Sequence, residues 1–127
     1  MKIAFTSDID WANELVISDT LKLFSDNNIK CTLFVTHKSK AINQCDRDLF
    51  EIGIHPNFNN NLISGNGRPA QEILKDLINP YPEAIGVRSH SITTSSSLLE
   101  IFKDNGIKYE SNQFIPYSKK IRPYKCW

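Results

Sequence analysis

The stretch Ala4–Trp11 reads AFTSDIDW, and the rest of the chain is best interpreted from it. The residues before Asp8 are typical of a strand, and the carboxylates of Asp8 and Asp10 follow with one residue between them. Side chains alternate along an extended chain, so both carboxylates are expected on one side, just past the strand's end. Carboxylates this close repel unless a cation or a shared proton separates them. A bound metal ion is therefore the first hypothesis, and the alternative is that one aspartate caps the following helix.

The composition indicates one folded domain spanning residues 1–127. A length of 127 residues with 40% hydrophobic residues is enough for one core and too short for two. Fifteen basic and fourteen acidic side chains leave a formal charge of +1, and neither sign forms a long block. This balance argues against nucleic acid or an anionic membrane as the partner.

Three features of the sequence predict a cytoplasmic location. The amino terminus has no charged leader followed by an apolar run, as a secretion signal would have. No segment approaches the roughly 18 apolar residues that span a bilayer, so no transmembrane segment is expected. Cys31, Cys45 and Cys126 are too widely spaced for a disulfide framework or a zinc knuckle. Cys31 falls in an expected strand and is interpreted as a small core residue.

Strand and helix patterns alternate along the chain. The expected strands are 2–7, 31–36, 49–55, 84–88 and 107–110, the first of them buried. The expected helices are 13–28, 69–78 and 98–105, while segments 38–48 and 56–68 read as irregular. Such alternation predicts an α/β fold with parallel strands joined by right-handed crossovers. At roughly 30 residues per unit, the chain holds about four units, which make an open sheet or half a barrel.

Polar side chains lie at or just past the ends of three expected strands: Asp8 and Asp10, then His55, then Arg88 and His90. The ends of parallel strands meet at one rim, so these side chains are expected to converge. One carboxylate and two imidazoles with an open position are the ligands of a catalytic Zn²⁺. A second carboxylate could take a proton from water, and an arginine could orient it. The alternatives are that His55 is a surface residue and that His90 caps the next helix.

Four segments together resemble the polysaccharide deacetylase, or NodB-homology, family. They are Thr6–Asp10 (TSDID), Thr32–Val35 (TLFV), Glu51–Phe58 (EIGIHPNF) and Gly86–Ser91 (GVRSHS). The likeness is greatest to the branch encoded among surface-polysaccharide biosynthesis genes. The resemblance implies a distorted (β/α) barrel and a metal-dependent hydrolase that removes acetyl groups from N- or O-acetylated sugars.

The resemblance also implies roles for single residues. Asp8 matches the family's general base, and Arg88 matches the arginine that pairs with it. Asp10 and His55 match the metal-binding aspartate and the first metal-binding histidine. Metal-activated water would attack the acetyl carbonyl, and the metal, most plausibly zinc, would stabilise the oxyanion.

The chain departs from the family pattern in two places. Asn59 stands where the family has its second metal-binding histidine, so His90 is predicted to replace that ligand; a general acid or a substrate contact is the alternative role for His90. The family's late segment supplies a histidine that protonates the leaving group, and no histidine follows His90. Either another side chain does that work, or the chain is the amino-terminal half of a barrel, completed by a missing carboxyl-terminal portion or by an oligomer. Trp11, Asn57 and Asn59 are predicted to bind the acetylated sugar or polysaccharide.

Two other interpretations compete with a deacetylase. The first is a truncated remnant that keeps the metal ligands without completing turnover. The second is a receiver-like or flavodoxin-like module in which Asp8 and Asp10 hold Mg²⁺. The histidines at 55 and 90 disfavour the second interpretation, because Mg²⁺ prefers oxygen ligands.

Overall fold

The sheet consists of five parallel strands. The computed structural model describes residues 3–63 and 65–113. The strands are β1 (Phe5–Asp8), β2 (Cys31–Val35), β3 (Phe50–Ile54), β4 (Gly86–Val87) and β5 (Tyr109–Glu110). They lie in the order β1-β2-β3-β4-β5, and each pair of neighbours is parallel. The predicted α/β class with parallel strands is confirmed.

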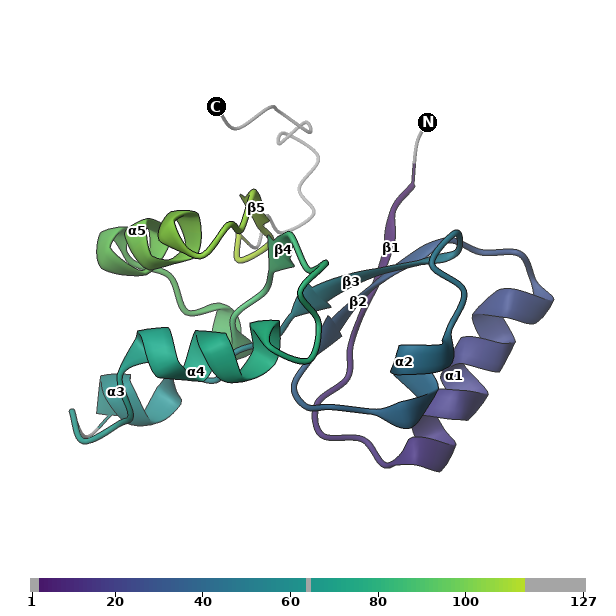
Figure 1. Cartoon of the computed structure of the whole chain (residues 1–127), viewed down its shortest axis with the longest axis horizontal. Coiled ribbons are helices and arrows are strands. Elements are labelled where there is room, and N and C mark those ends of the chain that lie inside the picture. The colour runs from purple at the N-terminus through teal and green to yellow at the C-terminus, as the bar shows by residue number, and fades with distance from the viewer. Residues whose placement is uncertain (1–2, 64, 114–127) are drawn as a thin grey trace, which may run out of the picture.

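Helices connect consecutive strands. They are α1 (Glu14–Asp26), α2 (Lys40–Gln44), α3 (Asn59–Ile63), α4 (Ala70–Ile78) and α5 (Ser96–Asp104), with a 3₁₀ turn η1 (His90–Ile92) before α5. In Figure 1, α1 and α2 lie together beside the first three strands, whereas α4 and α5 lie together nearer to β4 and β5. Within the described residues, no helix is long and apolar enough to cross a membrane.

The core forms where the helices cover one face of the central strands. Alternate residues of β2 and β3 are buried there, including Leu33, Ile52 and Ile54. The amphipathic helix α4 adds Leu74 and Leu77 to the same cluster. Cys31 is buried, as predicted for a small core residue, and Cys126 lies outside the described residues.

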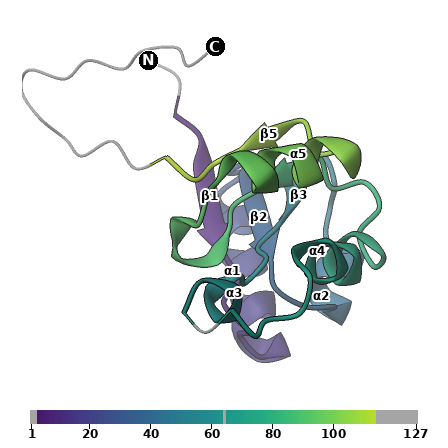
Figure 2. The ribbon, with the colours of Figure 1, turned by 90° about the vertical axis from the view of Figure 1, so that its left-hand side faces the viewer.

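The sheet curves strongly, and a contact from Arg88 shows it. Arg88 directly follows β4, yet its Nη1 lies 2.9 Å from Asp8 Oδ1 and its Nη2 lies 3.0 Å from Thr6 Oγ1, both on β1. In a flat sheet three strand spacings would separate these elements by about 14 Å, farther than an arginine side chain extends. The strands therefore form a half-barrel, which Figure 2 shows from the side where α3, α4 and α5 lie. This confirms the predicted half-barrel.

The prediction that the first strand is buried was wrong. Phe5 keeps 47% of its surface exposed, because β1 is an edge strand with a neighbour on one side only among the described residues. Leu15, Val16 and Leu23 on α1 are exposed as well, and the face that packs against the core instead carries Ile17 and Leu21.

Two segments predicted to be irregular each contain a short helix. Segment 38–48 contains α2, whose cap is the Ser39 side chain, which accepts from Ile42 N–H. Segment 56–68 contains α3. Each of these helices has five residues, too few for a helical repeat of apolar positions to appear in the sequence.

Candidate metal centre

The chain leaves β1 through a left-handed turn. Asp10 and Trp11 have φ values of 40° and 58°, in the region that non-glycine residues seldom occupy. Trp11 N–H donates to Thr36 Oγ1 over 2.9 Å, which secures the turn to the end of β2. The sequence suggested that continued extension of the strand positions the carboxylate of Asp10. In the structure this turn positions it instead.

Side chains from three connections meet at the rim. Asp10 Oδ1 lies 3.3 Å from His55 Nε2 and 3.4 Å from His90 Nδ1, and these two nitrogens are 3.3 Å apart. A tetrahedral Zn²⁺ with bonds of about 2.0–2.1 Å holds neighbouring ligand atoms about 3.3–3.4 Å apart. The predicted ligands therefore have the mutual spacing that zinc requires, and they are the one such cluster among the described residues.

The hydrogen bonding of His55 also suits a metal ligand. His55 Nδ1 lies 2.6 Å from the carbonyl oxygen of Arg88, which can only accept, so Nδ1 carries the proton. His55 Nε2 is then left with a lone pair that faces Asp10 Oδ1, itself an acceptor. The His55 side chain is only 4% exposed, so water reaches Nε2 poorly, whereas the Asp10 side chain is 55% exposed. A cation between them satisfies both, and a backbone carbonyl behind the ring is a common partner of ligating histidines.

Asp8 and Arg88 form an ion pair beside the three ligands. Asp8 Oδ1 lies 2.9 Å from Arg88 Nη1 and 4.0 Å from His55 Nδ1. The guanidinium is held by further contacts: Nη2 donates to Ser111 Oγ over 2.8 Å, and the group lies 4.4 Å from the centre of the Phe34 ring. Asp8 is therefore fixed close to the ligands without joining them.

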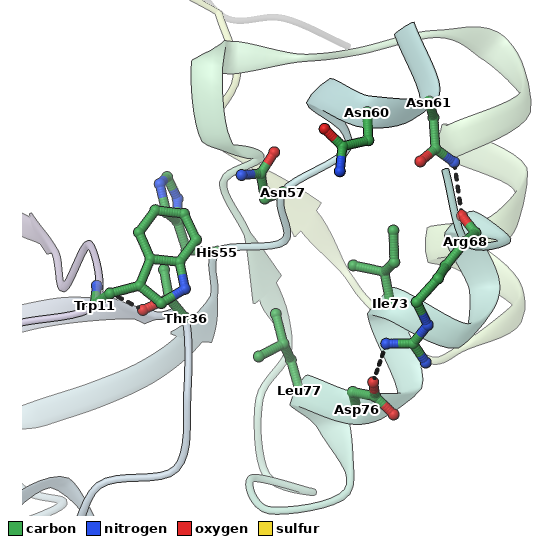
Figure 3. Close-up of a pocket in the computed structure, with 10 residues that line it drawn as sticks. All are labelled: Trp11, Thr36, His55, Asn57, Asn60, Asn61, Arg68, Ile73, Asp76 and Leu77. Atoms are coloured by element: carbon green, nitrogen blue, oxygen red, sulfur yellow. Dashed lines mark hydrogen bonds and ion pairs between the residues drawn. The ribbon is translucent and has the colours of Figure 1, made fainter. Parts of the chain in front are cut away.

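A cavity of about 340 Å³ opens beside the cluster (Figure 3). Trp11, His55 and Asn57 line it, and the Trp11 ring also meets the edge of His90 at a centroid distance of 5.2 Å. Asn59 does not line the cavity, because its side chain turns to Ser91 Oγ at 3.1 Å. The structure thus brings Trp11 and Asn57 to the site and directs Asn59 to the edge of it.

Three alternative interpretations for these residues do not match the structure. The side chain that caps α1 is Asn13, not Asp8 or Asp10. The cap of α5 is Ser95, not His90. His55 is buried rather than at the surface.

Sequence reasoning missed residues that hold the site in place. Thr36 secures the Asp10–Trp11 turn, and Ser111 binds Arg88. Thr36 is the last residue of one expected strand and Ser111 directly follows another, so the rule that found His55 could have found them as well. Threonine and serine did not suggest a metal ligand or a base, and so the sequence analysis did not assign these two residues to the site.

Comparisons with known proteins identify the family to which the chain belongs. Residues 5–127 match the family described as "WbmS-like: Polysaccharide deacetylase". A solved structure from Bordetella bronchiseptica, of a protein described as a polysaccharide deacetylase involved in O-antigen biosynthesis, has 36% sequence identity to the chain and superposes with a TM-score of 0.88. The match covers 94% of this chain and 50% of that one, so this chain spans half the length of the solved relative. Among curated proteins no match is found.

Proposed function

Because the chain belongs to the WbmS-like family of polysaccharide deacetylases, we propose that it hydrolyses acetyl groups of a sugar or polysaccharide with a bound divalent metal. The observation that carries this proposal is the triangle of Asp10 Oδ1, His55 Nε2 and His90 Nδ1, with sides of 3.3–3.4 Å. A hydrolase of this kind needs such a triangle together with a nearby base.

Asp10, His55 and His90 would hold the metal. Two imidazoles and one carboxylate favour zinc over magnesium, which prefers oxygen ligands throughout. A zinc ion bound there would acidify a water molecule and polarise the acetyl carbonyl. Asn59 stands where the family has its second metal-binding histidine, and His90 would supply the missing ligand.

Asp8 is the base of the proposed reaction. Its carboxylate is 30% exposed, so a water molecule at the rim can reach it. The ion pair with Arg88 keeps the carboxylate in one orientation, with the other oxygen available to accept a proton from the attacking water. That water would add to the acetyl carbon, and the bond from this carbon to the sugar nitrogen or oxygen would then break. The departing nitrogen or oxygen would gain the proton that Asp8 took from the water, so the products are acetate and the free amino or hydroxyl group of the sugar.

The substrate is an acetylated sugar, free or within a polysaccharide. The solved relative is described as acting in O-antigen biosynthesis, and we extend that substrate class to this chain. Trp11, half exposed beside His90, provides an aromatic face for a sugar ring, and Asn57 provides an amide. Asn59 would act on the substrate through Ser91, whose hydroxyl it contacts.

Asp8→Asn tests the proposed base. Removal of the proton acceptor is expected to lower acetate release from acetylated sugars by about 10²–10⁴-fold, with zinc still bound in one equivalent. Asp19→Asn makes the same chemical change on the exposed surface of α1 and serves as the matched control. Wild-type turnover in Asp8→Asn would remove Asp8 from this role.

The length of the chain favours one second candidate, a metal-binding domain that does not complete turnover. This chain spans half of its solved relative, so the other half could supply groups that catalysis needs. Zinc analysis run beside the acetate assay separates the two functions. Stoichiometric zinc without acetate release would favour the non-catalytic domain.

A further inference from the structure

The turn that carries His90 has an unfavourable backbone conformation. His90 begins the 3₁₀ turn η1, and the next two residues, Ser91 and Ile92, have φ values of 57° and 55°. A β-branched residue such as isoleucine rarely adopts this left-handed region, because its Cβ comes too close to the following carbonyl oxygen. Such a conformation costs free energy and persists only where surrounding groups hold it. The turn therefore needs contacts that keep it in this shape.

Apolar packing contributes little to holding this turn. The Ile92 side chain keeps 44% of its surface exposed. Ile92 N–H donates to the carbonyl of Ser89 over 2.9 Å, a bond within the turn that does not attach it to the sheet. One backbone bond reaches outside, from His90 N–H to the carbonyl of Pro56 over 2.9 Å. A single attachment of this kind leaves the far end of the turn free to move.

Asn112, which follows β5, contacts both ends of the turn. Its Oδ1 accepts Ser89 N–H over 2.7 Å just before η1, and its Nδ2 lies 3.4 Å from the carbonyl oxygen of Thr93 just after it. Nδ2 also donates to Glu110 Oε2 over 2.8 Å, which fixes the orientation of the amide. The residue is only 3% exposed, so water competes weakly for these bonds. Asn112 thus connects the two ends of η1 to the end of the last strand.

The position of the His90 ring depends on this turn. His90 Nδ1 faces Asp10 Oδ1 at 3.4 Å and His55 Nε2 at 3.3 Å. The second ring nitrogen of His55 is bound to the Arg88 carbonyl, but within residues 3–63 and 65–113 no hydrogen bond involves the second ring nitrogen of His90. Ligating histidines are usually oriented by such a bond. His90 must therefore be oriented mainly by the backbone that carries it.

We propose that Asn112 is a positioning residue for the metal centre, because it holds the strained turn that directs His90 Nδ1 toward the metal. The inference rests on the proposed function, which assigns His90 to the metal. Each left-handed turn beside a metal ligand would then be secured by one side chain that is distant in sequence. Thr36 Oγ1 secures the turn of Asp10, and the Asn112 amide secures the turn of His90.

The first measurement is zinc affinity, by competition with a chromophoric chelator. Asn112→Ala is expected to bind zinc at least tenfold more weakly than the wild type. Ile92→Gly, added to Asn112→Ala, should recover at least threefold of this loss, because glycine adopts the left-handed region without a Cβ penalty. Asn112→Asp keeps the shape and the acceptor but cannot donate to the Thr93 carbonyl. It is the second variant, with the same expected loss, if Asn112→Ala does not fold.

The matched control is Asn105→Ala at the end of α5. Asn105 is also partly buried, and its Nδ2 donates to the Ile101 carbonyl over 2.8 Å, so its loss should lower stability and leave zinc affinity unchanged. A second measurement needs no metal. The rings of His90 and Trp11 lie 5.2 Å apart between centroids, so a nuclear Overhauser effect between them is expected in the zinc-free wild type and in Asn105→Ala. It should be lost in zinc-free Asn112→Ala.

The outcomes separate this inference from the proposed function. Equal zinc affinity of Asn112→Ala and the wild type, or an unchanged Overhauser effect in Asn112→Ala, would overturn the inference. So would an equal loss of zinc affinity in Asn105→Ala, or no recovery on adding Ile92→Gly. Acetate release by the wild type together with any of these results would keep the proposed function. Loss of zinc affinity and of the Overhauser effect in Asn112→Ala, without acetate release by the wild type, would keep the inference and reject the function.

Discussion

The two faces of the curved sheet differ in what they contain. The face toward the helices carries Leu33, Ile52 and Ile54, which are fully or almost fully buried in an apolar cluster. The concave face carries Asp8 and Arg88, with the Arg88 guanidinium over the Phe34 ring. Phe34 is buried but does not belong to the helix-side core. The same strands thus stabilise the fold on one side and present charged groups on the other.

Polar pairs continue along the concave face away from the metal centre. The Tyr109 hydroxyl on β5 donates to the Glu51 carboxylate on β3. Burial, and then the Glu51 carboxylate, raise the pKa of Tyr109, so the phenol remains neutral and able to donate. Gly86 makes room for this ring, because a Cβ at that position would collide with it. The concave face is therefore held by specific polar contacts, whereas the helix side is held by apolar packing.

Ile54 and His55 are adjacent residues that test this comparison directly. Ile54→Ala removes a fully buried side chain from the helix side and leaves a cavity. The free energy of unfolding is expected to fall by about 2–5 kcal/mol, the largest stability effect of these variants. Urea denaturation followed by circular dichroism measures it. A loss of less than about 0.5 kcal/mol would show that this face is not the main source of stability.

His55→Ala and Asp10→Ala change the rim, where the polar side chains meet. Each removes one of three metal ligands, so stoichiometric zinc binding is expected to be lost. The metal-free proteins should keep most of the unfolding free energy, because neither side chain belongs to the apolar cluster and Asp10 is exposed. Zinc titration against a chromophoric chelator and metal-free denaturation measure the two effects. Full zinc occupancy in both variants would reject the assigned ligands.

Thr36→Val is expected to have a smaller effect on the same metal. Valine has nearly the same shape but cannot accept the Trp11 N–H, so the left-handed turn that carries Asp10 loosens. Zinc affinity should fall about tenfold, the lower end of the range for groups that position a ligand. Thr36→Ser keeps the hydroxyl and should restore the affinity. Equal affinities for the valine and serine variants would show that the hydroxyl does not position Asp10.

The smallest expected effect lies where the beginning of α1 meets the beginning of α2. The Glu14 carboxylate accepts hydrogen bonds from the N–H groups of Lys40 and Ala41 and from Ser39 Oγ. The Ala41 N–H is the largest cause of its lowered pKa. A carboxylate with a lowered pKa stabilises the folded state above its unfolded value, near 4.5, and this contribution is lost as the pH falls through the folded value.

Glu14→Gln should therefore melt at a lower temperature than the wild type at pH 7. The difference should shrink as the pH falls below about 4.5. Thermal melts at several pH values measure it. A difference that stays constant down to pH 3 would show that the charge of Glu14 is not responsible.

The sequence alone predicted the order of the major elements and the residues at the rim. Apolar alternation located β2 and β3, and the positions at or directly after the strand ends marked Asp8, His55 and Arg88. Short helices were harder to predict from the sequence. The first N–H groups of α2 donate to the carboxylate of Glu14, which is distant in sequence, and no local pattern indicates that contact. Burial in β1 was also mispredicted, because a strand's apolar residues do not say whether it has one neighbour or two.

The sequence by itself determined which residues lie at the rim. A βαβ repeat brings the residues that follow each parallel strand to one rim, whatever their types. Only the tertiary structure decided how closely they meet. The left-handed turn at Asp10 and the protonation of His55 at Nδ1 both depend on groups distant in sequence, the Thr36 hydroxyl and the Arg88 carbonyl. Likewise, curvature brings Arg88 across the sheet to Asp8. Local sequence sets the direction of a strand, whereas distances between strand ends follow from packing of the whole sheet.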